Sequence, residues 1–245
     1  MTKVERISVE KRLNIYGIGV VEVESFWNFF IPTVQYLSGG MLVTGKIFLY
    51  TLVLSIPLGF LISLLRISKF KVFSALASVY IWVLRGTPLL LQIFFVYYGL
   101  PYLNLFGLKL PSLDNFTSAI IAFVLNYAAY FAEIFRAGIA SIDKGQYEGA
   151  KALGYTYWQT MRRIIIPQMA RVVLPPISNE TITLVKDTSL VSVVALEDVM
   201  RLTNTRVSST ASVAPFGVAA VFYLLMTLIL TVLFNKLDKR YNQYE

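Results

Sequence analysis

Five long apolar runs dominate the pattern of hydrophobic and polar residues along this chain. They lie at about 40–65, 72–100, 116–139, 160–186 and 213–235, with short polar segments between them. An α-helix needs about 20 apolar residues to cross the roughly 30 Å hydrocarbon core of a bilayer, and each run is long enough. The pattern therefore predicts an all-α integral membrane protein with about five transmembrane helices in one domain over residues 40–240.

Residues 1–39 do not fit this pattern and form a predicted N-terminal extension. Residues 1–25 are polar and lack an apolar stretch with a small-residue cleavage site, so they do not resemble a signal peptide. The next segment, FWNFFIPTVQYL over residues 26–37, is rich in aromatic side chains but too short to cross a bilayer. It is typical of a segment that lies at headgroup depth. The role of the extension is not indicated by its sequence.

The composition agrees with a membrane protein and excludes several kinds of chemistry. Hydrophobic residues make up 56% of the chain and charged residues 15%, and the mean hydropathy is +0.64, which is too apolar for an ordinary soluble domain. The chain has no cysteine and no histidine. Disulfides, thiolate and imidazole catalysis and the usual zinc sites are therefore excluded, and no metal site is predicted.

The basic residues gather at the ends of the apolar runs. The net charge is +8, and basic residues are concentrated at 66–71, between the third and fourth runs, and after the fifth. By the positive-inside rule these three segments lie in the cytoplasm. An odd number of spans then predicts an N-terminus outside and a C-terminus in the cytoplasm. This placement accounts for the basic charge, so nucleic acid is not a predicted partner.

Polar residues interrupt the second run in a way that predicts a broken helix. Arg85 and Gln92 lie seven residues apart, on one helix face, and Gly86 and Pro88 interrupt the turn between them. Free backbone groups at membrane depth are tolerated only where protein or a cavity satisfies them. Arg85 either binds a carboxylate or serves structure by snorkelling or pairing with a neighbouring helix.

The third and fourth runs also carry polar residues. Asn126 and Glu133 share one helix face, and Glu133 and Arg136 form an (i, i+3) pair. This face either lines a translocation path or forms a polar clasp inside the bundle. The mixed charges of the set suit a zwitterionic substrate. The candidates for a substrate path are Arg85, Thr87, Gln92, Asn126, Glu133, Asn179 and Glu180.

The polar segment at 141–160 contains a predicted short helix. Residues 146–148 form its first turn, and Gly154 supplies a left-handed stop. The helix is too short and too polar to span, so we expect it on the cytoplasmic surface with Ala150 and Leu153 turned toward something apolar. The alternative is an ordinary amphipathic connector.

Four segments together resemble the permeases of the polar-amino-acid uptake family of ATP-binding-cassette (ABC) importers, which includes histidine, glutamine, arginine and cystine importers. They are RGTPLLLQ (85–92), YFAEIFRAGI (130–139), GQYEGAKALG (145–154) and IIIPQMARVVLPPISNETITLVKDTSLVSV (164–193). The segment at 141–160 resembles the EAA loop of that family. Two departures are visible, because Gly149 stands where the family usually has Ala and PQM replaces the commoner PQA.

The resemblance implies a type I ABC importer permease fold in a bacterial cytoplasmic membrane, with the 141–160 helix as a coupling helix. It implies two ATP-binding subunits, a second permease copy or paralogue, an extracytoplasmic substrate-binding protein, surrounding lipid and an amino-acid substrate. The residues that would dock the ATPase are Gly145, Glu148, Gly149, Ala150, Leu153 and Gly154.

The chain contains no GxxxxGK[ST] phosphate-binding loop. We therefore expect a transport subunit that is not itself an enzyme and needs no cofactor, with ATP bound by the partner subunit. The resemblance implies import of a polar amino acid by alternating access. The alternative is a secondary transporter driven by an ion gradient, which the absence of a visible inverted repeat and the presence of the docking helix disfavour.

Overall fold

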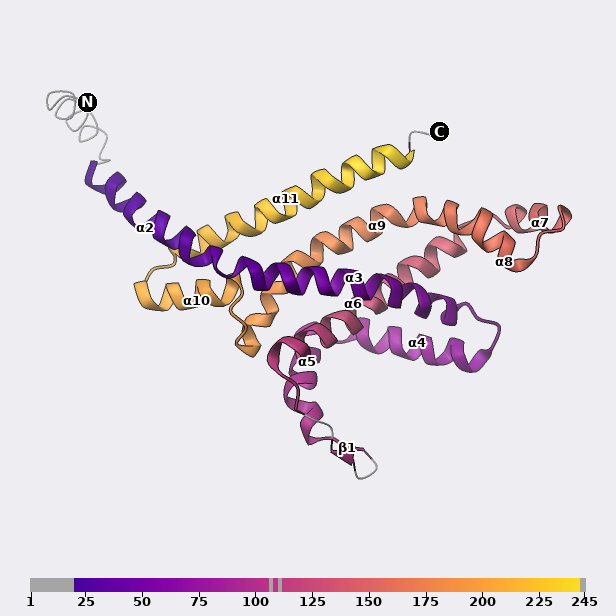
Figure 1. The fold of residues 1–245 in the computed structure, drawn as a ribbon, viewed down its shortest axis with the longest axis horizontal. Helices are drawn as coiled ribbons and strands as arrows, with labels where there is room; N and C mark the ends of the chain where they lie inside the picture. The colour runs from indigo at the N-terminus through magenta and orange to yellow at the C-terminus, as the bar shows by residue number, and fades with distance from the viewer. Residues whose placement is uncertain (1–19, 106–107, 110–111, 243–245) are drawn as a thin grey trace.

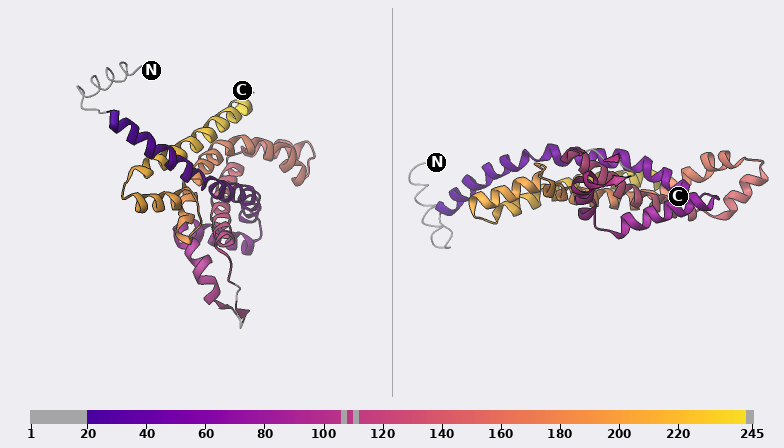
Figure 2. Two further views of the ribbon diagram at one scale, coloured as in Figure 1. Left: turned by 60° about the vertical axis from the view of Figure 1, so that its left-hand side comes forward. Right: turned by 90° about the horizontal axis from the view of Figure 1, so that it is seen from below.

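The computed structural model describes residues 20–105, 108–109 and 112–242. These residues form an elongated, flat assembly of helices (Figures 1 and 2). The long helices are α2 (Val20–Ser38), α3 (Met41–Arg66), α4 (Lys71–Gly86), α6 (Asn115–Ala140), α9 (Ile166–Asp187) and α11 (Ala214–Asn242).

Shorter elements join the long helices. A small hairpin pairs β1 with β2 in antiparallel register and projects from the bundle (Figure 1). The short elements are α5 (Leu89–Phe94), the π-helix η1 (Phe95–Gly99), the 3₁₀-helix η2 (Leu100–Tyr102), β1 (Asn104–Leu105), β2 (Leu108–Lys109), α7 (Lys144–Ala152), α8 (Tyr157–Thr160), the π-helix η3 (Met161–Ile165), the 3₁₀-helix η4 (Thr188–Val194) and α10 (Val199–Thr210).

Three helical stretches among the described residues are long and apolar enough to cross a membrane: Trp27–Arg66, Asn115–Ala140 and Ala214–Arg240. A fourth arises if α4 and the segment Leu89–Tyr102, which meet at a bend of 106°, count together as one span. The predicted run at 72–100 is this broken pair. The predicted run at 160–186 is helical as α8, η3 and α9 but is less apolar, so its crossing stays a prediction.

The N-terminal extension differs from its predicted outline. Helix α2 already begins at Val20 and continues through Pro32 to Ser38, so it is longer than the predicted segment at 26–37. It contacts α10 and α11. Residues 1–19, the remainder of the extension, lie outside the described residues.

Helix α6 holds the core together. Its side chains Phe123, Tyr127 and Phe131 are almost completely buried, and it packs against α3, α4, α5 and α9. Small residues let these helices approach closely, as is usual for helices in membranes. At Gly59 of α3, a Cβ atom would come within 2.9 Å of the carbonyl oxygen of Ala128. The α3–α6 crossing therefore depends on a residue without a side chain.

The junction before α10 is also tightly built. The Asp198 carboxylate caps α10 by accepting hydrogen bonds from the backbone N–H groups of Arg201 at 2.9 Å and Met200 at 3.0 Å. A Cβ atom on Gly40 would lie 2.5 Å from the backbone of Asp198, so the start of α3 presses against this cap. Burial raises the pKa of Asp198 to about 6.

Candidate functional site

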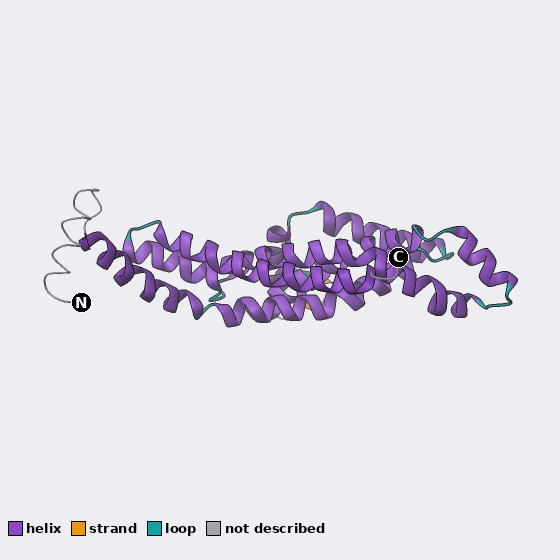
Figure 3. Cartoon of the chain, turned by 90° about the horizontal axis from the view of Figure 1, so that it is seen from above, coloured by secondary structure: helices purple, strands orange, loops and turns teal. Residues whose placement is uncertain are grey.

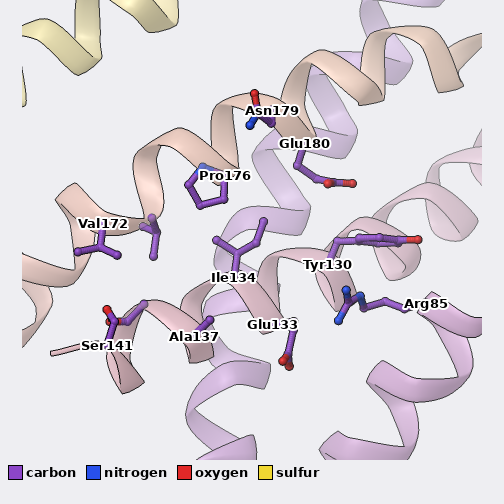
Figure 4. Close-up of a pocket in the computed structure, with 12 residues that line it drawn as sticks. Arg85, Tyr130, Glu133, Ile134, Ala137, Ser141, Val172, Pro176, Asn179 and Glu180 are labelled. Carbon is purple, nitrogen blue, oxygen red and sulfur yellow. The ribbon is translucent and has the colours of Figure 1, made fainter.

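A cavity of about 580 Å³ lies between α4, α6 and α9 (Figure 4). Arg85 lines it from the end of α4, Tyr130 and Glu133 line it from α6, and Asn179 and Glu180 line it from α9. Apolar side chains complete the wall, and they are Ile134, Ala137, Val172, Val173 and Pro176. The cavity therefore combines an apolar lining with a few polar groups, as small-molecule sites do.

The charged groups of the cavity differ in how they are partnered. Arg85 is exposed, and its guanidinium carbon lies 5.1 Å from the centre of the Tyr130 ring, within the range of a cation–π contact. The Glu133 carboxylate accepts a hydrogen bond from Arg136 Nε at 3.0 Å and a second from Nη2. Glu180 forms no salt bridge among the residues that the structure describes. One cation and one acid thus face the cavity without a salt-bridge partner in the described part of the chain.

The helix break at 86–88 is closed by side-chain amides. Pro88 has no backbone N–H, so the Leu84 carbonyl, four residues earlier, loses its helical partner. That oxygen accepts hydrogen bonds from Gln92 Nε2 at 2.9 Å and Asn126 Nδ2 at 3.0 Å. Asn126 Nδ2 also donates a hydrogen bond to Gln92 Oε1 at 3.0 Å. Thr87 Oγ1 accepts from Gln92 at 2.8 Å and donates to the Val83 carbonyl at 2.9 Å.

The seven predicted path residues therefore fall into two groups. Arg85, Glu133, Asn179 and Glu180 line the cavity. Thr87, Gln92 and Asn126 form the clasp that satisfies the broken helix, and the cavity wall does not include them. The predicted path residues do not include Tyr130, which lies within the segment YFAEIFRAGI and whose ring contacts Arg85 at the cavity.

The predicted short helix at 141–160 is present as α7. The Asp143 carboxylate caps its N-terminus by accepting from the Gly145 N–H at 2.6 Å, and Gly154 has φ of +76°, the left-handed stop expected from the sequence. Ala150 is 2% exposed, so this predicted docking residue is buried within the described part of the chain. The other predicted docking residues are exposed, and they are Gly145, Glu148, Gly149, Leu153 and Gly154.

Leu153, which we expect to turn toward something apolar, is not covered by the described residues of this chain. It is 76% exposed and stands near Tyr157 and Trp158 in the chain, which are 61% and 75% exposed. The Tyr157 and Trp158 rings pack edge to face, with their centroids 6.1 Å apart. We call these three side chains the apolar tip. In the sequence, the aromatic run YTYW (155–158) within an otherwise polar loop indicates this apolar tip.

The α7–α8 segment forms one end of the molecule, and α2 and α10 lie toward the opposite end (Figures 1 and 3). Burial of the Tyr147 ring on the inner side of α7 raises the pKa of its hydroxyl. The described residues contain no group of three or more acidic side chains placed to hold a metal ion. This end carries an exposed apolar tip beside the exposed face of α7.

Helices long and apolar enough to cross a membrane, around a cavity that holds a few charged groups, are typical of a membrane transport subunit. Residues 55–243 match the family described as binding-protein-dependent transport system inner membrane component, and the chain belongs to this family. The permease resemblance of its sequence is thereby confirmed.

Relatives at the level of sequence span nearly the whole chain. The arginine transport system permease protein ArtQ of Bacillus subtilis (strain 168) is 39% identical over 211 residues, which cover 86% of this chain and 94% of ArtQ. The L-cystine transport system permease protein TcyB of the same organism is 34% identical, over 90% of each chain. The glutamine transport system permease protein GlnP of Escherichia coli (strain K12) is 33% identical, over 87% of this chain and 96% of GlnP.

Solved structures confirm the predicted type I importer fold. A chain in a crystal structure of an amino acid ABC transporter with histidines has a TM-score of 0.77 and 35% identity, and the match covers 86% of this chain and 98% of that one. A chain of the MetNI methionine ABC transporter has a TM-score of 0.65 at 14% identity, covering 89% of this chain and 99% of that one. At that low identity the second likeness shows the fold alone.

Proposed function

We propose that this chain is the permease subunit of an ABC importer that moves a polar amino acid into the cytoplasm by alternating access, powered by separate ATP-binding subunits. The observation that carries the proposal is the α7 helix with its apolar tip. Side chains as large as Leu153, Tyr157 and Trp158 are 61–76% exposed beside a capped, surface helix, an arrangement typical of a protein interface.

The charge distribution supports the orientation of the complex. The α3–α4 turn, the α7–α8 segment and the end of α11 lie toward the same end of the molecule (Figure 1), and each carries basic residues. The positive-inside rule assigns that end to the cytoplasm. The C-terminus is then cytoplasmic, and the α10 end faces outward, where a substrate-binding protein would deliver its ligand.

The cavity supports the substrate class. Arg85 can receive a carboxylate, and Glu180 and Glu133 can receive an ammonium group, so the lining suits a zwitterion. The named relatives include permeases of arginine, cystine and glutamine systems, which supports a polar amino acid. Two permease chains, either identical or paralogous, would together enclose the pathway, with lipid around them and ATP bound only by the partner subunits.

Co-purification tests the docking role. The chain is expressed together with a candidate ATP-binding subunit of an amino-acid importer, and the captured ATPase is quantified. We expect Glu148→Lys and the double variant Leu153→Ala, Trp158→Ala to lose most of the captured ATPase, because both alter the exposed docking side chains. Gln35→Ala on α2, an exposed position at the far end, is the matched control. Equal capture by wild type and both docking variants would refute this docking surface.

A further inference from the structure

The helical segment that runs from the docking end to the cavity contains a weak point at the π-helix η3, which we call the η3 joint. From α8 to α9 the chain winds as one helix, but over η3 it widens to a π-turn in which the N–H of Ile166 donates to the carbonyl of Met161, five residues back. Pro167 follows directly. The Pro167 ring would clash with the carbonyl four residues earlier in a regular helix, and a wider turn relieves that clash. Pro167 therefore accounts for the π-turn at the η3 joint.

A single side-chain amide spans this joint. Gln168 Nε2 donates a hydrogen bond to the Ile164 carbonyl inside the joint at 3.1 Å. It also donates to Gln146 Oε1 on α7 at 3.1 Å. An amide nitrogen carries two hydrogens, so both are used. Among the hydrogen bonds of the described residues, Gln146–Gln168 is the one side-chain pair that joins α7 to α9.

The remaining contacts of α7 do not fix its position along α9. Ala150 is buried, and Tyr147 packs at the edge of the core, but apolar contacts of this kind have no preferred direction. A hydrogen bond is directional. The Gln146–Gln168 pair therefore sets the register between α7 and the start of α9.

We propose that Gln168 is a positioning residue that carries movement of α7 through the η3 joint into α9. This inference rests on the proposed function. With both bonds in place, displacement of α7 moves the first turn of α9 with it, and the helix conveys that movement to Pro176 and Glu180 at the cavity. Without them, the π-turn absorbs the displacement. One hydrogen bond changes the equilibrium between two conformations by about tenfold or less. The Gln146–Gln168 bond can therefore break and re-form in each transport cycle.

The number of amino acids imported per ATP hydrolysed tests the proposal. The assembled complex is reconstituted in vesicles, and Gln168→Met is compared with wild type, since methionine has a similar length and donates no hydrogen bond. We expect a ratio about three- to tenfold lower in Gln168→Met, with an unchanged amount of bound ATPase. Gln146→Met should lower the ratio less, because the bond to Ile164 remains. The double variant should match Gln168→Met.

The controls separate this inference from the proposed function. Gln35→Met makes the same substitution at an exposed position on α2 and should leave the ratio unchanged. A wild-type ratio in Gln168→Met, or losses that add in the double variant, would overturn the positioning role while leaving the proposed function intact. Absence of ATP-dependent import in the wild-type complex would overturn both.

Discussion

The carbonyl oxygen of Leu84 on α4 accepts a hydrogen bond from the side-chain amide of Asn126 on α6, at 3.0 Å. This bond exists because Pro88 cannot supply the helical N–H. From the sequence, Asn126 either lines a path or forms a polar clasp. This hydrogen bond assigns Asn126 to the clasp. The cavity beside it is left to Arg85, Glu133, Asn179 and Glu180.

Asn126→Leu should therefore destabilise the protein. The substitution removes the bonds to Leu84 and Gln92 at a position that is 4% exposed. We expect a loss of about 1–3 kcal/mol in the free energy of unfolding, seen as a lower Tm in detergent. Asn179→Leu is the matched control, because Asn179 is exposed in the cavity and should change uptake with little change in Tm. The reverse pattern would return Asn126 to the path.

Local signals explain what the sequence predicts well. Helix α7 begins at Lys144, two residues before the predicted first turn at 146–148, because the Asp143 carboxylate caps it there. Its end follows from Gly154, and the break near Pro88 follows from the missing N–H. The meeting of Asn126 with Leu84 does not, because heptad spacing places residues on a face of their own helix but leaves the register between two helices open. The sequence also leaves open what covers Leu153, since an apolar side chain shows no sign of whether its partner belongs to the same chain.

Two of the three glycines of the docking segment, Gly149 and Gly154, should respond in opposite ways to alanine. Gly149 has nothing within 4 Å of an added Cβ and lies inside α7, so Gly149→Ala should stabilise the helix by up to about 1 kcal/mol and retain transport. Gly154 has φ of +76°, so Gly154→Ala should cost about 1 kcal/mol. Gly154→Pro should also uncouple transport, because proline cannot adopt that φ and loses the N–H bond to Lys151.

ATPase stimulation by substrate and thermal unfolding of each purified variant measure these effects. Substrate-stimulated ATPase at the wild-type level in complexes of Gly154→Pro would contradict the role of this turn. Loss of transport in Gly149→Ala, with normal folding, would show that the docking surface excludes a methyl group there.

Glu133→Gln should lower transport more than assembly. The change removes the charge that pairs with Arg136 in the cavity wall, so we expect uptake to fall about tenfold or more, from the loss of a charge-assisted bond. Uptake rate and the yield of assembled complex are measured together. Glu197→Gln, an exposed acid before α10, serves as control. Wild-type uptake kinetics in Glu133→Gln would leave Glu133 with a structural role alone.

Asp198 should make stability depend on pH. Its pKa is raised from 3.8 to about 6 by burial, so the folded state favours the protonated acid. The resulting stabilisation is present below about pH 4 and is lost as pH rises through about 6. The free energy of unfolding changes by about 3 kcal/mol or less over this range. Tm in detergent should therefore fall between pH 4 and 7. Asn caps helices as well as Asp, so Asp198→Asn should keep the cap and flatten this dependence. An equal slope in Asp198→Asn and wild type would assign the pH dependence to another group.

The source of energy for uptake distinguishes an ABC importer from a secondary transporter. The chain, its ATP-binding subunits and its substrate-binding protein are reconstituted in vesicles, and accumulation of labelled polar amino acids is followed with ATP supplied on the cytoplasmic side. We expect accumulation that requires ATP and persists when ionophores collapse the ion gradients. Accumulation that proceeds without ATP and stops with ionophores would contradict this expectation and identify a secondary transporter.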